Sequence, residues 1–94
     1  MYYVYVLRSL KDHKLYYGFT HDLKQRFQQH NDGLNKSTKY RRPLELIYYE
    51  AYINEEDAKQ RETFIKSGRG RDVLKIHLHN TLKAELAEVV KARV

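Results

Sequence analysis

The sequence has no cysteine, no tryptophan and no long hydrophobic run. Without cysteine the chain can build neither a disulfide framework nor a thiolate metal site, so a zinc finger is excluded and nothing points to an oxidising compartment. No apolar run approaches the ~20 residues of a membrane-spanning helix, and residues 1–7 continue into strand-like sequence without a separate signal region. We therefore expect a cytoplasmic protein.

The composition that remains is that of one small globular domain. Hydrophobic residues make up 41% of the chain and charged residues 32%, which is too apolar for a disordered chain. Because domains are typically ~100 to 150 residues long, the chain should build one core and not two. We expect a single domain over residues 1–94, with its core at residues 2–78 and a C-terminal helical extension at residues 79–94.

Positive charge is concentrated in two segments of the chain. The formal net charge is +6, and between residues 24 and 42 six Lys or Arg stand against the single acid Asp32. Clustered positive charge predicts a polyanionic partner such as nucleic acid, although a merely solvated basic surface remains the alternative. The residues expected to contact nucleic acid are Lys24, Lys36, Lys39, Arg41, Arg42, Lys66, Arg69 and Arg71.

The first two predicted strands form a hairpin. Residues 2–8 are β-branched or aromatic on both sides, as in a central strand. After the short polar connection at residues 12–14, the strand pattern resumes at residues 15–20, which predicts an antiparallel pair.

Two tyrosines can meet on this hairpin. Residues alternate sides along a strand, so Tyr3 and Tyr5 share one face, and antiparallel pairing can bring Tyr5 close to Tyr16. Gly18 lies in a strand interior and indicates close backbone approach, which would leave room for a ligand over Tyr16. The alternative is that these tyrosines only pack.

A short amphipathic helix follows the hairpin. Thr20 or Asp22 can cap its start, and Gly33 suits its end. Within it Arg26 and His30 are four residues apart and share a face directed at the edge of the sheet. An arginine there can offer a planar fork of donors to a phosphate; a solvated arginine is the alternative.

The second half of the chain reads as a loop, a strand and further helices. The basic loop at residues 34–42 leads to a strand at residues 44–52, and Asn54 caps a helix that runs to about Lys66. Residues 67–70 break the chain. One side of the strand should carry Leu44, Leu46 and Tyr48, and the other Ile47, Tyr49 and Ala51. Later helices are expected at residues 71–78 and around Leu82, Leu86, Val89 and Val90.

Glu62 is unusual because it lies on the apolar side of its helix. Ala58, Glu62 and Ile65 have the spacing of one helical face, so a carboxylate is predicted on the buried side. An unpaired buried charge is costly, so Glu62 should either pair with a cation such as Arg26 or ligate a metal. A single carboxylate suits Mg²⁺, which keeps much of its water shell. The histidines outside the proposed site, expected at the surface, are His13, His21, His77 and His79.

These residues, in this order, resemble the GIY-YIG nuclease superfamily, and the chain is similar to its small stand-alone members, which are related to the N-terminal nuclease domain of an excinuclease. Tyr3-Val4-Tyr5 stands at the first motif and Tyr16-Tyr17-Gly18 at the second. The helix residues Arg26 and His30 and the segment from Ala58 to Glu62 match later motifs. Tyr3 and Val4 replace the Gly and Ile of the family name, and Tyr17 replaces the second Ile.

The resemblance implies an α+β fold, a three-stranded antiparallel sheet flanked by helices in the order ββαβα plus C-terminal helices. It also implies phosphodiester hydrolysis with one divalent ion, Mg²⁺ or Mn²⁺, bound by Glu62. Arg26 would steady the scissile phosphate, Tyr5 and Tyr16 would line the side of attack, and His30 would assist in positioning or proton transfer. Tyr5 would take a proton from water, for which a nearby cation must favour its ionised form.

Three functions compete on the sequence alone. The first is a metal-dependent endonuclease, acting on DNA more readily than RNA and having a role in DNA repair. The second is a nucleic-acid-binding module without turnover, and the third is an interaction domain that uses the apolar C-terminal helix. The substrate structure, any protein partner for targeting and the oligomeric state stay open.

Overall fold

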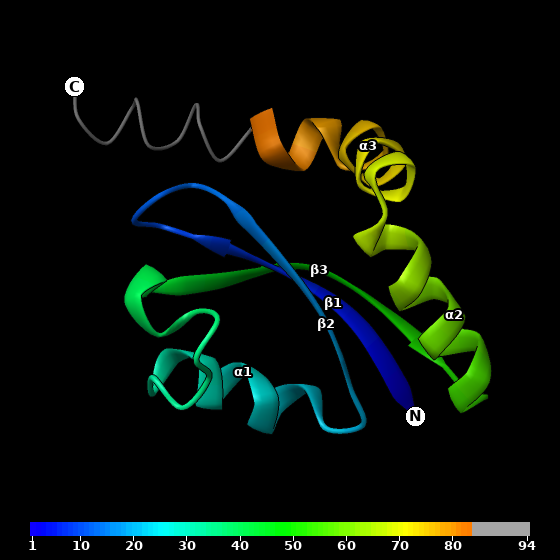
Figure 1. Cartoon of the computed structure of the whole chain (residues 1–94), viewed down its shortest axis with the longest axis horizontal. Helices are drawn as coiled ribbons and strands as arrows, with labels where there is room; N and C mark the ends of the chain where they lie inside the picture. Colours follow the sequence, from blue (N-terminus) through cyan, green and yellow to red (C-terminus); the bar gives the residue numbers. More distant parts are fainter. Residues whose placement is uncertain (84–94) are drawn as a thin grey trace. The chain divides into compact units, whose positions relative to one another are not determined.

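The computed structural model describes residues 1–83, and Figure 1 shows their arrangement. The elements in order are β1 (Tyr2–Ser9), β2 (Leu15–Thr20), α1 (Leu23–Asn31), the 3-10 helix η1 (Lys39–Arg41), β3 (Leu44–Tyr52), α2 (Glu55–Lys66) and α3 (Gly68–His77). The predicted α+β fold and the order ββαβα are confirmed. The apolar helix expected to continue to Val90 lies largely outside the described residues. The described residues form two compact units, residues 1–63 and residues 64–83.

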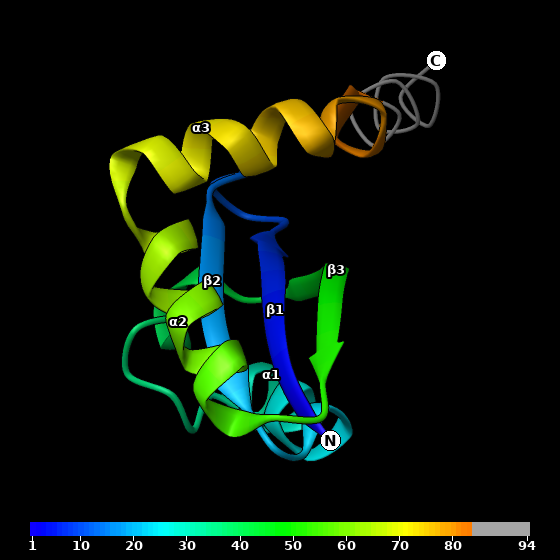
Figure 2. The same ribbon diagram turned by 90° about the vertical axis from the view of Figure 1, so that its right-hand side faces the viewer.

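The sheet is antiparallel with β1 in its centre, between β2 and β3. Figure 2 shows the three strands side by side in that order. Val4, Tyr5, Val6 and Leu7 are all almost fully buried, as the apolar character of both sides of this segment predicts. Because β1 is central, β2 is an edge strand.

A β-bulge changes the expected alternation of β3. Val6 pairs with Tyr48, whereas the next residue, Leu7, pairs with Leu46, so Ile47 is an additional residue in β3. Because a bulge inserts one residue, side chains beyond it lie on the opposite face from the one that simple alternation predicts. Leu46 therefore shares the face of Tyr49, and the prediction that it lies with Tyr48 is wrong.

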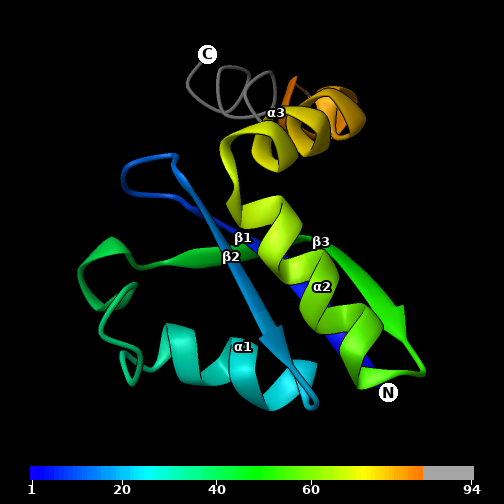
Figure 3. The ribbon, with the colours of Figure 1, turned by 45° about the vertical axis from the view of Figure 1, so that its right-hand side comes forward.

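The two helices of the first unit cover opposite faces of the sheet. On the Tyr5 face, Leu23 and Phe27 of α1 pack against a core that includes Leu7. On the other face, Arg61 of α2 forms an ion pair with Glu50, whose partner in β1 is Val4. Figure 3 shows α2 passing in front of β1, with α1 below the sheet. None of the described helices is long and apolar enough to cross a membrane.

The predicted helix ends are close to those observed. Asp22 Oδ1 accepts from the backbone N–H of Gln25 at 3.0 Å, and Gly33 has a φ of 79° just after α1, which glycine tolerates best. Residues 67–70 were expected to separate two helices, but only Ser67 lies between α2 and α3. Its hydroxyl accepts from Gly70 N at 3.1 Å and caps α3, which already begins at Gly68.

Candidate active site

Two tyrosines and one histidine form a cluster of rings on the α1 face, here called the phenol cluster: Tyr5, Tyr16 and His30. The ring centroids are 6.4 Å apart for Tyr5 and Tyr16, 5.8 Å for Tyr5 and His30, and 5.0 Å for Tyr16 and His30. The Tyr5 hydroxyl lies 2.9 Å from Nε2 of His30. The structure thus brings together the two strand tyrosines and the helix histidine that the sequence singled out.

Gly18 makes this cluster possible. It pairs directly with Tyr5 across the hairpin, and a Cβ atom at Gly18 would lie 2.3 Å from Cζ of Tyr5. The missing side chain therefore lets the Tyr5 ring lie across β2. Gly18 was expected to leave room for a ligand over Tyr16, but the space beside Gly18 is filled by the Tyr5 ring.

His30 is held on both sides. Its Nδ1 lies 2.7 Å from the hydroxyl of Thr38, and both residues have no exposed surface. Burial and then the charge of Arg26 lower the pKa of His30 to about 4, so the ring is neutral at pH 7. The role of Thr38 was not predicted from the sequence, because its contact with His30 depends on how a loop without periodicity folds back. In Figure 1 this segment, between α1 and β3, folds back beside α1.

The Tyr5 phenol is protonated in the protein without bound ions. Burial raises the pKa of Tyr5 to about 12, with a further rise from Tyr16, while the guanidinium of Arg26 acts in the opposite direction. The sequence analysis expected a cation to favour the ionised phenol. Arg26 does so, but burial outweighs it.

Arg26 and Glu62 complete the set of predicted catalytic residues. Arg26 donates a long hydrogen bond of 3.5 Å to the carbonyl of Phe19, which places its guanidinium beside edge strand β2, as predicted. Glu62 is half-buried on α2 between the buried Ala58 and Ile65. Its negative charge contributes to the raised pKa of Tyr5, so α2 brings a carboxylate into the electrostatic range of the phenol cluster.

One carboxylate, that of Glu62, lies within electrostatic range of Tyr5. Within residues 1–83 there is no group of three or more His, Cys, Asp or Glu side chains able to hold a metal. A divalent ion here would therefore have Glu62 as its carboxylate and would keep water or take phosphate oxygens elsewhere, which is how Mg²⁺ is commonly bound.

The basic residues of the first unit have two different environments. Arg41 forms an ion pair of 3.0 Å with Asp12, so it ties the loop to the β1–β2 connection. Arg42 donates to the carbonyl of Lys39 at 2.9 Å. Lys24 lies on α1, Lys36 and Lys39 lie between α1 and β3, and all three lysines are exposed. Lys66, Arg69 and Arg71 belong to the second unit and are exposed there. His13, His21, His77 and His79 are exposed, as predicted.

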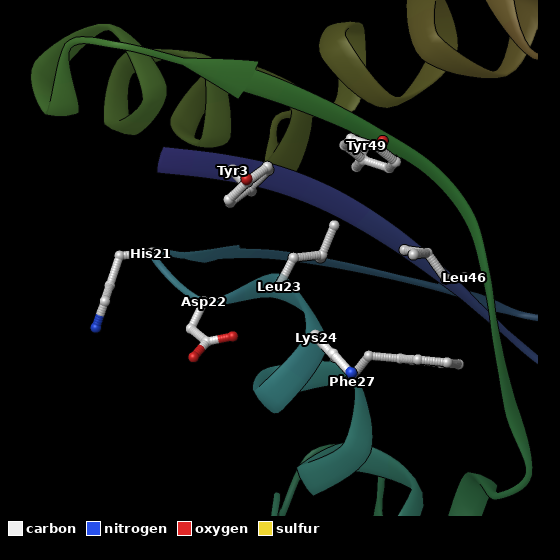
Figure 4. Close-up of a pocket in the computed structure, with 8 residues that line it drawn as sticks. All are labelled: Tyr3, His21, Asp22, Leu23, Lys24, Phe27, Leu46 and Tyr49. Carbon is white, nitrogen blue, oxygen red and sulfur yellow. The ribbon is translucent and has the colours of Figure 1, made fainter. Parts of the chain in front are cut away.

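A hollow of about 490 Å³ lies on the α1 face of the sheet. Figure 4 shows its lining, which is mainly apolar: Tyr3, His21, Asp22, Leu23, Lys24, Phe27, Leu46 and Tyr49. The rings of Tyr3 and Tyr49 meet edge to face with centroids 6.0 Å apart. None of Tyr5, Tyr16, His30 and Glu62 lines it, so this apolar hollow is separate from the candidate active site.

The fold and the order of these residues agree with a comparison to known families. Residues 1–74 match the model of the GIY-YIG catalytic domain. The chain belongs to the GIY-YIG family, whose members are endonucleases that act on nucleic acid.

Its relatives within that family are small proteins named UPF0213. The UPF0213 protein of Clostridium perfringens is 37% identical over 86 residues, which cover 90% of this chain and 91% of that protein. One from Pediococcus acidilactici is 40% identical over 84 residues, covering 84% and 83%. The solution NMR structure of a UPF0213 protein from Bacillus halodurans is 35% identical, covers 79% of this chain and 82% of that one, and has a TM-score of 0.49. These names state no substrate.

Proposed function

We propose that this protein is a metal-dependent endonuclease that hydrolyses phosphodiester bonds of DNA, in the cytoplasm, with one Mg²⁺ or Mn²⁺ ion. The observation that carries the proposal is the hydrogen bond of 2.9 Å between the Tyr5 hydroxyl and His30 Nε2, beside a guanidinium and a carboxylate from two different helices. A phenol linked to a neutral imidazole has a route for its proton.

The proton route is set by the partners of His30. If Nδ1–H donates to the Thr38 hydroxyl, Nε2 carries a lone pair and accepts from the Tyr5 O–H. Tyr5 can then pass its proton to His30 as it receives one from the attacking water, whose oxygen bonds to phosphorus while the P–O bond to the leaving sugar oxygen breaks and that oxygen takes a proton from solvent water. Because burial and Arg26 disfavour the imidazolium, this transfer requires a bound cation that lowers the pKa of Tyr5.

The remaining residues position the substrate and stabilise charge. Arg26 can present two N–H groups to the scissile phosphate from the edge of β2, and Tyr16 lines the same side. Glu62 would hold the divalent ion. When bound, that ion supplies positive charge that favours the ionised Tyr5 and offsets the charge developing on the phosphate.

Cleavage of a panel of labelled linear, flapped and branched DNA and matching RNA tests the proposal. The wild type should cut at least one DNA substrate with Mg²⁺ or Mn²⁺ and none with EDTA. Tyr5→Phe keeps the ring and removes the hydroxyl, so it should slow cleavage by ~10²-fold or more. Tyr49→Phe, on an exposed tyrosine of the same face, is the matched control and should cleave normally. A pure wild-type protein that cuts nothing on the panel contradicts the proposal.

The second candidate is a nucleic-acid-binding module without turnover. The pKa of about 12 for Tyr5 in the ion-free protein favours it, because a protonated phenol is not a base. Salt-sensitive binding with no metal-dependent cleavage would support this alternative.

A further inference from the structure

A second hollow, of about 600 Å³, lies where α1 ends. It is here called the basic hollow, and its lining residues are Lys11, Asn31, Lys39, Tyr40, Arg42 and Pro43. Three of these side chains are positively charged and none is negatively charged. Its volume is in the range of ordinary ligand sites. Charge and size together suit a nucleotide, whereas the lining of the apolar hollow does not.

Two of the three cations of the basic hollow, Lys11 and Arg42, donate hydrogen bonds to backbone carbonyls. Lys11 Nζ donates to the carbonyl of Tyr40 at 3.2 Å, and Arg42 donates to the carbonyls of Lys39 at 2.9 Å and Asn31 at 3.4 Å. Among residues 1–83, no carboxylate forms an ion pair with Lys11, Lys39 or Arg42. Arg41, one residue away, is neutralised by Asp12. The backbone contacts thus hold these cations in place and leave their charge for an anion.

Tyr40 supplies an aromatic surface at the rim. It is 77% exposed, although a ring of this size gains free energy when it is covered. Lys39 Nζ lies 5.5 Å from the ring centroid. A nucleobase can cover such a ring by stacking. In a duplex both faces of each base are already stacked on neighbours, so the base must be unpaired.

The basic hollow is connected to the active site through one loop. Thr38, which holds His30, lies two residues before Tyr40, and two residues of chain span at most ~7 Å. Asn31 follows His30 directly, and its amide is fixed by hydrogen bonds to the backbone of Leu44 at 2.8 and 3.0 Å. A nucleic-acid strand bound in the basic hollow would therefore lie within a few nucleotides of the phenol cluster.

We propose that the basic hollow binds an unpaired nucleotide next to the scissile phosphate, with the base on Tyr40 and its phosphates near Lys11, Lys39 and Arg42. This inference rests on the proposed function and adds the substrate class, a nucleic acid with a single-stranded segment. The chemistry recognised is a base and a phosphate, which DNA and RNA share.

Binding measured in EDTA tests the inference without cleavage. Fluorescence anisotropy would compare a short labelled oligothymidylate, an oligouridylate of equal length and a blunt DNA duplex. Tyr40→Ala should weaken binding of the preferred single strand by ~10-fold and leave duplex binding nearly unchanged. Tyr40→Phe should retain the affinity, because stacking needs only the ring. Lys11→Ala should lower the slope of log affinity against log salt by ~0.7.

The matched control is Tyr49→Ala, which removes an exposed tyrosine from the apolar hollow and should not change single-strand binding. Tyr40 is exposed, and thermal unfolding should be the same for Tyr40→Ala and the wild type. The inference is overturned if Tyr40→Ala binds single strands normally, if it weakens single-strand and duplex binding equally, or if Tyr49→Ala gives the same loss. A protein that cleaves but ignores Tyr40 overturns only this inference. One that binds single strands through Tyr40 but never cleaves overturns the proposed nuclease activity instead.

Discussion

Both faces of the sheet gather tyrosines, an arginine and a glutamate, but they connect them differently. On the α2 face Glu50 accepts hydrogen bonds from Tyr48 at 2.7 Å, Tyr52 at 2.5 Å and Arg61 at 3.0 Å. On the α1 face the Tyr5 hydroxyl is bonded to a neutral histidine. The glutamate whose charge acts on this phenol, Glu62, lies on α2 and not on α1.

This difference separates a structural network from a site for chemistry. Burial alone would raise the pKa of Glu50, but the hydrogen bonds from Tyr52, Arg61 and Tyr48 hold it below its usual value. Burial, together with the bond to Glu50, raises the pKa of Tyr48 and Tyr52 to about 12. Each partner in this network stabilises the charge state of the others. The same kinds of residue therefore do not indicate a site unless their pairing leaves a proton route and room for a ligand.

The largest expected effect follows from removing the charge at Glu62. Glu62→Gln should slow cleavage by ~10³-fold, since it removes the proposed ligand of the ion that stabilises the transition state. Affinity for DNA should change little, because it depends mainly on phosphate contacts from Lys and Arg. Single-turnover cleavage and anisotropy give the two values. Cleavage at the wild-type rate would remove Glu62 from the mechanism.

A methyl group at Gly18 should disturb the phenol cluster almost as strongly. Gly18→Ala places its Cβ where the Tyr5 ring lies, so the phenol must move away from His30. We expect cleavage to fall by ~10²-fold, the contribution of a positioned acid or base. The ring NMR signals of His30 should shift as well. If both cleavage and these signals are unchanged, the close packing of Tyr5 on Gly18 does not determine activity.

Several parts of this arrangement follow from local sequence and others do not. The Asp22 cap, the turn at Gly33 and the apolar β1 were predictable because each depends on residues close in the chain. The extra residue Ile47 depends on how two strands pair, and the contact of Thr38 with His30 depends on how a loop folds back. It could be predicted that Tyr5, Tyr16 and Arg26 lie close together. The raised pKa of Tyr5 could not, because it depends on how far burial outweighs the guanidinium of Arg26.

Disrupting the hydrogen-bond network around Glu50 on the α2 face should lower stability and leave cleavage unchanged. Glu50→Gln removes the charge that pairs with Arg61 in a partly buried site, so the free energy of unfolding should fall by about 2 kcal/mol, between the values for surface and buried pairs. In a domain of this size the melting temperature should drop by about 10 °C. Calorimetry at pH 7 measures this. A stable Glu50→Gln variant with ~100-fold slower cleavage would reverse the assignment of the two faces.

The smallest effect concerns pH and the buried His30. Unfolded, this histidine binds a proton below its usual pKa of 6.5, whereas in the folded protein it does so only below about 4. Between these values the unfolded state holds more protons, so the free energy of unfolding decreases as pH falls, and the contribution of His30 is fully present only above 6.5. From pH 7 to 5 the loss should be about 1.8 kcal/mol.

Melting temperatures of the wild type and His30→Gln across this range would isolate the contribution of His30. The low pKa of Glu50 places its own effect at more acidic pH. The slope between pH 7 and 5 should be smaller in His30→Gln. An equal slope in both proteins would mean that another group titrates there.

Titration with Mn²⁺, followed through the tyrosine ring signals in NMR spectra, tests most directly whether Glu62 rather than Glu50 takes a divalent ion beside the phenols. A paramagnetic ion at Glu62 should broaden the signals of Tyr5 and Tyr16 in the wild type, leave those of Tyr48 and Tyr52 comparatively sharp, and lose this effect in Glu62→Gln. Equal broadening on both faces, or broadening of Tyr5 that persists in Glu62→Gln, would contradict the account.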